Sequence, residues 1–276
     1  MAIQHSVTSP TRSSTAPGRR ARHSNYVLAS AITMAFAALP AAAHGPNGDG
    51  IQAAKAADGN PDFDIIHAKV SRQDNVATFH MGVAGEVGNT LPTPAGELAG
   101  APAYAYVWPT SIDSYEAGFE RDAGILALAV ATHPDFDDTP LFDENGDKDT
   151  GNDGGTWHTH WVVLKPDERC GEGALTVVDI PKGTTPRLPK TWPGLPILLD
   201  SPGWEPVIES DTVEVKVAFD NAAALDTASY DGVTAGLMVN KNIHAPLFCV
   251  SNVLDVASGD LSLPGKITPP KAITNQ

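Results

Sequence analysis

The most restrictive feature of this sequence is a set of short segments in which apolar and polar residues alternate. The clearest is DTVEVKVAF, where Val213, Val215 and Val217 alternate with Glu214 and Lys216. A period of two places successive side chains on opposite faces of a β-strand. No stretch of about 12 residues has the 3.6-residue periodicity of an amphipathic helix. The pattern therefore favours an all-β fold.

Seven further segments have a strand pattern of the same kind. Two of them flank Gln73-Asp74-Asn75 and predict a β-hairpin whose inward faces carry Ile66, Ala68 and Val70 on the first strand and Phe79, Met81 and Val83 on the second. The other five are residues 103–112, 124–133, 156–164, 232–240 and 246–256. Turn residues separate most of them. The expected architecture is a two-sheet antiparallel β-sandwich with long proline-rich and acidic loops.

Residues 1–43 have the pattern of a secretory signal peptide. They contain four arginines and no acidic residue, and the apolar run YVLASAITMAFAALP is followed by Ala41-Ala42-Ala43. Such leaders typically have a positively charged N-terminal region, then a short apolar stretch, and small residues at the cleavage site. Cleavage near Ala43 would make the chain periplasmic, exposed at the cell surface or secreted. Residues 44–61 are expected to be a flexible lead-in, and 62–276 a single β-sandwich metal-binding domain.

The charge balance restricts the possible partners. Of the 18 basic residues, 14 remain after the four arginines of residues 1–43 are removed, against 33 acidic ones, so the formal charge of the rest is −19. Such a surface argues against nucleic acid and against anionic membranes, which both need a basic face. It favours cations. No later stretch approaches 18 uninterrupted apolar residues, so no membrane span is expected.

The chain has two cysteines, Cys170 and Cys249. In an oxidising compartment an isolated pair is expected to form one disulfide. The alternative is a thiolate ligand for copper, because His244 precedes Cys249 by five residues. The availability of a second cysteine favours the disulfide.

An acidic loop lies between the segments 124–133 and 156–164. Side chains with oxygen atoms recur at every second position, in Asp143, Asn145, Asp147 and Asp149. A further acidic residue, Asp153, follows four positions later. This is the spacing with which EF-hand loops place oxygen ligands around Ca²⁺. At the loop position where an EF-hand has its bidentate Glu this chain has Gly154, so we expect a calcium loop of another kind, closed by Asp153 or Asp135.

A His-Thr-His step follows the acidic loop directly. On a strand, His158 and His160 would share one face about 6 to 7 Å apart, which allows both imidazoles to reach one transition ion. We expect His80 to be the third ligand, because its side chain lies opposite the apolar face of its strand. His67, His133 and His244 are the competing candidates. Imidazole ligands suit copper and zinc.

Together, the acidic loop and WHTHW resemble the copper-regulated surface copper-binding proteins of methanotrophic bacteria. The resemblance implies a copper site at His158 and His160 with Trp157 nearby. It also implies a separate calcium site at the acidic loop. Trp157 is one position before His158, whereas the family's tryptophan is two positions before a histidine.

The sequence thus predicts an exported, non-catalytic metal-binding protein with a structural calcium loop and a copper or zinc site. One alternative is a secreted copper-dependent oxygenase that chelates copper through an N-terminal His44. Another is a calcium-stabilised interaction or adhesion module with incidental histidines.

Overall fold

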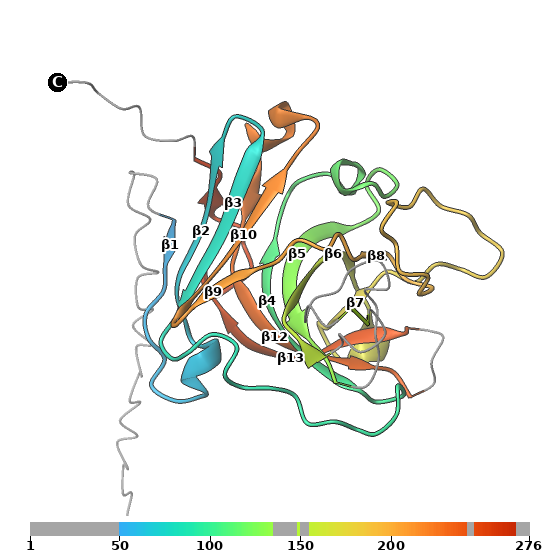
Figure 1. Cartoon of the computed structure of the whole chain (residues 1–276), viewed down its shortest axis with the longest axis horizontal. Coiled ribbons are helices and arrows are strands. Elements are labelled where there is room, and N and C mark those ends of the chain that lie inside the picture. Colours follow the sequence, from blue (N-terminus) through green and yellow to red (C-terminus); the bar gives the residue numbers. More distant parts are fainter. Residues whose placement is uncertain (1–49, 135–147, 150–154, 242–245, 269–276) are drawn as a thin grey trace, which may run out of the picture. The chain divides into compact units, whose positions relative to one another are not determined.

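The computed structural model describes residues 50–134, 148–149, 155–241 and 246–268. Within these residues the fold is built from antiparallel strands joined by turns and short 3-10 helices (Figure 1). The predicted all-β antiparallel class is therefore confirmed. None of the helices in the described part of the chain is long and apolar enough to cross a membrane.

A five-stranded sheet contains strands from both halves of the sequence. Its order is β1 (Ile51–Gln52), β2 (Ile65–Gln73), β3 (Val76–Val83), β10 (Thr212–Ala218) and β9 (Val207–Glu209). The predicted hairpin is formed by β2 and β3, and Asp74 at its turn has a φ of 54°. Figure 1 shows β10 beside β3, where Val215 lies opposite Phe79.

The larger sheet closes on itself. Its order is β5 (Ile125–Thr132), β4 (Pro102–Pro109), β12 (Val233–Val239), β13 (Phe248–Val256), β7 (Leu175–Val177), β6 (His158–Pro166) and β8 (Leu199–Asp200). Closure comes from an additional pairing of β5 with β6. One layer of the expected sandwich is thus a closed sheet, and this sheet has an interior of its own.

The remaining elements are short. β11 (Ser229–Tyr230) pairs with β14 (Gly265–Lys266). The 3-10 helices within the described residues are η1 (Pro61–Phe63), η2 (Ser114–Ala117), η4 (Glu168–Cys170) and η5 (Ala222–Leu225). These elements connect strands and contribute little to either sheet.

Alternation along the strands separates two hydrophobic cores. On β4 the large residues Tyr106 and Trp108 face the five-stranded sheet, where the Phe79 ring packs edge-on against Trp108 at 6.0 Å. Ala103 and Ala105 belong to the second core, inside the closed sheet. A closed sheet of six strands encloses a narrow space, so small inward residues are needed to fit it. The alternation of Ala with large residues in AYAYVW therefore suits this position.

Most predicted inward faces are observed, with one shift on β2. The register shifts between Ile65 and His67, so Ile65 is fully buried and Ile66 only half-buried. An irregularity of one residue moves the side chains before it to the other face of the strand. The expected inward position of Ile66 is wrong for this reason.

The predicted disulfide between Cys170 and Cys249 is present and links η4 to β13. The proline-rich segment 181–206 lies on the closed sheet and contains β8. Its residues Ile197 and Leu199 are buried and belong to the second hydrophobic core, that of the closed sheet. The segment is therefore an ordered cover.

Candidate metal centre

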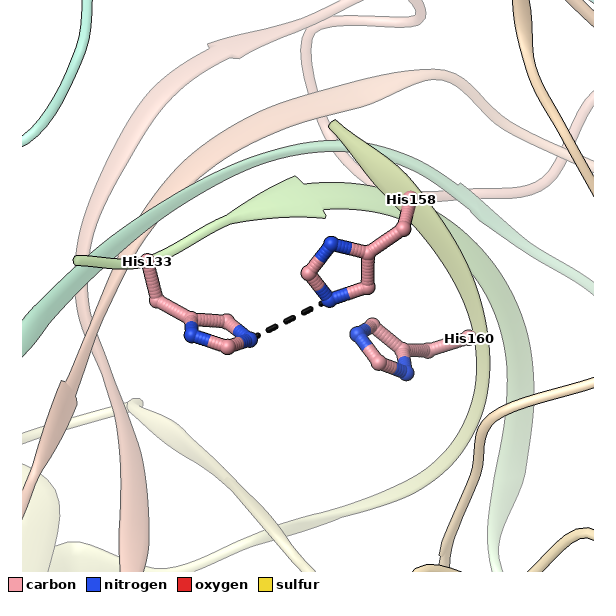
Figure 2. A group of neighbouring side chains, drawn as sticks. All are labelled: His133, His158 and His160. Atoms are coloured by element: carbon pink, nitrogen blue, oxygen red, sulfur yellow. Dashed lines mark hydrogen bonds between the residues drawn. The ribbon is translucent and has the colours of Figure 1, made fainter. Parts of the chain in front are cut away.

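Three histidines meet at one end of the closed sheet. His158 and His160 are on β6, and His133 follows the last residue of β5. Because β5 and β6 are antiparallel and Ala131 pairs with His158, the end of β5 lies beside the start of β6. Figure 2 shows the three side chains pointing toward one another inside the ring of strands. Each is only 2–3% exposed.

The spacing of the imidazole nitrogens suits a single metal ion. One ring nitrogen from each of His133, His158 and His160 lies within 4.8 Å of the other two, and in the described part of the chain this group consists of histidines alone. The Nε2 atoms of His133 and His158 are 3.2 Å apart. Two nitrogens that bind one tetrahedral ion at about 2.0–2.1 Å each are separated by about 3.3 Å. The group could therefore hold a metal ion with little movement.

Hydrogen bonds to backbone carbonyls orient two of the rings. Nδ1 of His158 lies 2.9 Å from the Thr156 carbonyl, and Nδ1 of His160 lies 3.3 Å from the Asp200 carbonyl and 3.2 Å from Ser201 Oγ. A carbonyl oxygen only accepts hydrogen bonds, so Nδ1 carries the proton in both rings. The lone pair is then on Nε2. Histidines that bind metals are usually held by this arrangement.

The roles of the two nitrogens in the short contact between His133 and His158 depend on the tautomer of each ring. Without a metal ion, the Nε2–H of His133 donates to the lone pair of His158 Nε2, since two lone pairs at 3.2 Å would repel each other. A bound metal ion would take the place of this proton. His133 would then keep its proton on Nδ1. Metal binding at this centre therefore needs a change of tautomer at His133 and none at His158.

The centre borders a cavity of about 60 Å³ inside the closed sheet, lined in part by His133 and His160. The remaining side chains around this cavity are hydrocarbon, and they include Ala105, Ala129, Val162, Leu237 and Phe248. Charges are poorly screened in such an environment, and an ion needs neutralising or strongly binding ligands there.

Asp200 supports the centre through its backbone. Its carboxylate lines a different cavity of about 810 Å³, together with Trp161 and Thr191. Burial raises the pKa of Asp200 to about 6, although its carboxylate accepts a hydrogen bond of 2.6 Å from Thr191 Oγ1. The part of Asp200 that touches the centre is the carbonyl that accepts from His160.

The structure places His80 in the five-stranded sheet, apart from this group. His80 is on β3, where its ring is 5.4 Å from that of His67 and its Nδ1 is 3.9 Å from a carboxylate oxygen of Glu214. Burial, followed by the charge of His67, lowers the pKa of His80. The third histidine beside His158 and His160 is His133.

The expected calcium ligands fall almost wholly outside the described residues. Asp143, Asn145, Asp147 and Asp153 are not described, and Asp149 is described as exposed. His44 and His244 also lie outside the described ranges.

Trp157 does not face the three histidines. Its indole Nε1 donates to the Gly88 carbonyl at 3.2 Å, and its ring lies 5.0 Å from that of Tyr106. Residues 157, 159 and 161 alternate with the histidines, so they lie on the outer face of β6.

One local pattern in the sequence points to His133. In the segment ILALAVATH, Ala129, Ala131 and His133 follow with a period of two, and so they share a face. That face becomes relevant only once β5 is known to pair with β6.

Comparison with family models, curated proteins and solved structures finds no match for this chain.

Proposed function

We propose that this chain is an exported, non-catalytic metal-binding protein that holds copper or zinc on His133, His158 and His160. The observation that carries the proposal is the convergence of three buried imidazoles whose ligand nitrogens lie within 4.8 Å of one another. Burying three histidines together without an ion costs stability, because each ring brings polar atoms into an apolar interior. Metal ligation is a function that offsets this cost.

The ligand set favours copper over zinc. Copper binds nitrogen ligands more strongly than zinc does at the same site. The resemblance to the copper-binding surface proteins of methanotrophs agrees with this choice. Zinc is the alternative, because three histidines with an open fourth position also suit that ion.

Export and a calcium loop belong to the same proposal. The disulfide between Cys170 and Cys249 supports an oxidising compartment. The leader pattern of residues 1–43 supports secretion. The alternating oxygens of Asp143, Asn145, Asp147 and Asp149, with Asp153, support a calcium site separate from the histidines.

Metal analysis of the purified chain tests the histidine site. We expect one copper or zinc ion per chain in the wild type and a large loss of affinity, on the order of 100-fold or more, in His158→Ala and His133→Ala, since each removes one of three ligands. His80→Ala is the matched control, because it removes a histidine from another strand. Equal metal binding by all variants would contradict the proposal, and so would a loss confined to His80→Ala.

A further inference from the structure

A cavity of about 810 Å³ is bordered by η2, by the proline-rich cover and by the end of β10. We infer that this cavity binds a neutral saccharide. By the same measure the cavity beside the histidines has about 60 Å³, so this one is far roomier. The three histidines are not among the residues that line it, and the inference is therefore independent of the proposed metal site.

Aromatic rings form one part of the cavity wall. Trp161 and Phe219 are buried and pack edge-on, with ring centroids 6.1 Å apart. Trp204 is only half-buried, and its ring lies 6.4 Å from that of Trp161. The face of an aromatic ring carries the negative part of its quadrupole. The C–H groups on one face of a pyranose ring are apolar and weakly positive, so an accessible indole such as that of Trp204 is a stacking surface for a sugar.

Asp200 places a buried carboxylate in the same wall. It is 3% exposed, and its carboxylate accepts hydrogen bonds from Thr191 Oγ1, at 2.6 Å, and from the backbone N–H of Ser201. No basic side chain of the described residues neutralises it. A carboxylate has about four acceptor positions, and leaving them unfilled in a buried place costs stability. The hydroxyl groups of a sugar are donors that would fill the remaining positions.

The charged groups around the cavity balance one another. Three basic and three acidic side chains are among the described residues that line it, and they are Arg121, Arg187, Lys190, Glu116, Asp200 and Asp220. A wall without net charge does not select strongly for an anion or a cation. It does offer both donors and acceptors in planar groups, and each sugar hydroxyl both donates and accepts. A neutral ligand with many hydroxyl groups therefore fits this wall better than an ion does.

Hydrogen bonds connect the three segments that surround the cavity. A guanidinium nitrogen of Arg187, in the cover, donates to the carbonyls of Tyr115 and Phe119 at 2.9 and 2.8 Å. The side-chain amide of Asn221, which follows β10, donates to a carboxylate oxygen of Glu116 in η2 at 3.2 Å. The wall is thus held in place before a ligand arrives, which reduces the conformational entropy lost on binding.

Binding of oligosaccharides tests the inference. The purified chain is applied to an array of neutral oligosaccharides of glucose, galactose, mannose, xylose and N-acetylglucosamine, together with acidic oligosaccharides that contain uronic acids. We expect the chain to bind at least one neutral oligosaccharide and to show no preference for the acidic ones. Isothermal titration calorimetry then gives the Kd for the neutral oligosaccharide that binds most strongly.

Two variants remove the groups that carry the inference. Trp204→Ala and Asp200→Asn should each weaken the binding of that oligosaccharide by at least about 10-fold, since the loss of a stacking ring or of a buried charged acceptor is large at a binding site. Trp192→Ala is the matched control, because Trp192 is a half-buried tryptophan of the same cover and does not line the cavity. It should bind the oligosaccharide like the wild type.

The outcomes separate this inference from the proposed function. An array without any bound neutral oligosaccharide would overturn the inference, and so would binding restricted to the uronic acids, which would assign the cavity to an anion. Unchanged binding in both variants would place the sugar elsewhere and overturn it as well. Copper or zinc content should be the same in Trp204→Ala as in the wild type. Where Trp204→Ala does not fold, Asp200→Asn, which keeps the size of the side chain, decides the test.

Discussion

At the residue scale, Asp62 shows how one carboxylate organises a loop that the strand pattern does not explain. It is buried in η1 and accepts hydrogen bonds from the side chains of Thr90, at 2.6 Å, and Asn89, at 3.0 Å, and from the backbone N–H of Glu86, at 3.0 Å. These donors favour the ionised form, and the bond from Thr90 is the main cause of a pKa below the ordinary 3.8. The segment after β3 is thereby attached to η1.

The pH dependence of this contribution has a definite sign. Because folding lowers the pKa of Asp62, its stabilising effect is full above about pH 4 and is lost as the pH falls through the lower pKa of the folded state. Asp62→Asn should lower the free energy of unfolding at pH 7 by about 1 kcal/mol or more, since hydrogen bonds to a charged group are stronger than those to a neutral amide.

Urea unfolding at pH 7 and pH 3 checks this expectation. The difference between Asp62→Asn and the wild type should shrink at pH 3, while Asp58→Asn, at an exposed position, should differ little from the wild type at either pH. A difference of equal size at both pH values would show that packing, and not ionisation, explains the effect.

At the element scale, the glycine before strand β12 lies close to the five-stranded sheet. A Cβ atom on Gly232 would lie 2.6 Å from the Cβ of Ala68 and 3.3 Å from the Cε of Met81. The Cβ of Ala68 belongs to a strand and cannot move without its backbone. Gly232 therefore sets the distance between the end of β12 and strand β2.

Gly232→Ala should destabilise the fold by about 1–3 kcal/mol, the range for overpacking a well-packed core. The matched control is Gly236→Ala on β12, where the nearest atom to an added Cβ is 3.5 Å away, an ordinary contact. Thermal unfolding of both variants, followed by circular dichroism, gives the comparison. Similar melting temperatures for the two variants would contradict the close approach at Gly232.

The strands themselves could be predicted well, because their signal is local. A period of two in DTVEVKVAF or AYAYVW is a property of a few consecutive residues, and burial on one face follows from it. The irregularity before His67 could not be read in this way, because it depends on how β2 pairs with β3. The inward position expected for Ile66 failed for that reason.

At the scale of the whole molecule, the three-histidine group joins two strands whose pairing closes the larger sheet. His133 follows β5, whereas His158 and His160 belong to β6, and His158 comes 25 positions after His133 in the sequence. An ion bound to all three would hold this closure together. Its binding should therefore stabilise the entire fold.

Linkage gives the size of this stabilisation. A ligand that binds only the folded state at 100 times its Kd adds about 2.7 kcal/mol to the free energy of unfolding. Copper or zinc should thus raise the melting temperature of the wild type, and removal by a chelator should reverse the rise. Scanning calorimetry of the wild type and His160→Ala checks this. A rise of equal size in His160→Ala would place the stabilising ion elsewhere.

The sequence by itself determined the all-β class, the faces of most strands, the pairing of Cys170 with Cys249 and the common face of His158 and His160. These features depend on local periodicity or on the count of one residue type. Only the tertiary structure decided that the larger sheet closes, that His133 and not His80 joins the pair, and that a hydrocarbon-lined cavity lies beside them. The physical reason is that strand pairing is non-local: His80 and His133 both belong to segments with a strand pattern, and only the hydrogen bonds between β5 and β6 bring His133 beside His158 and His160.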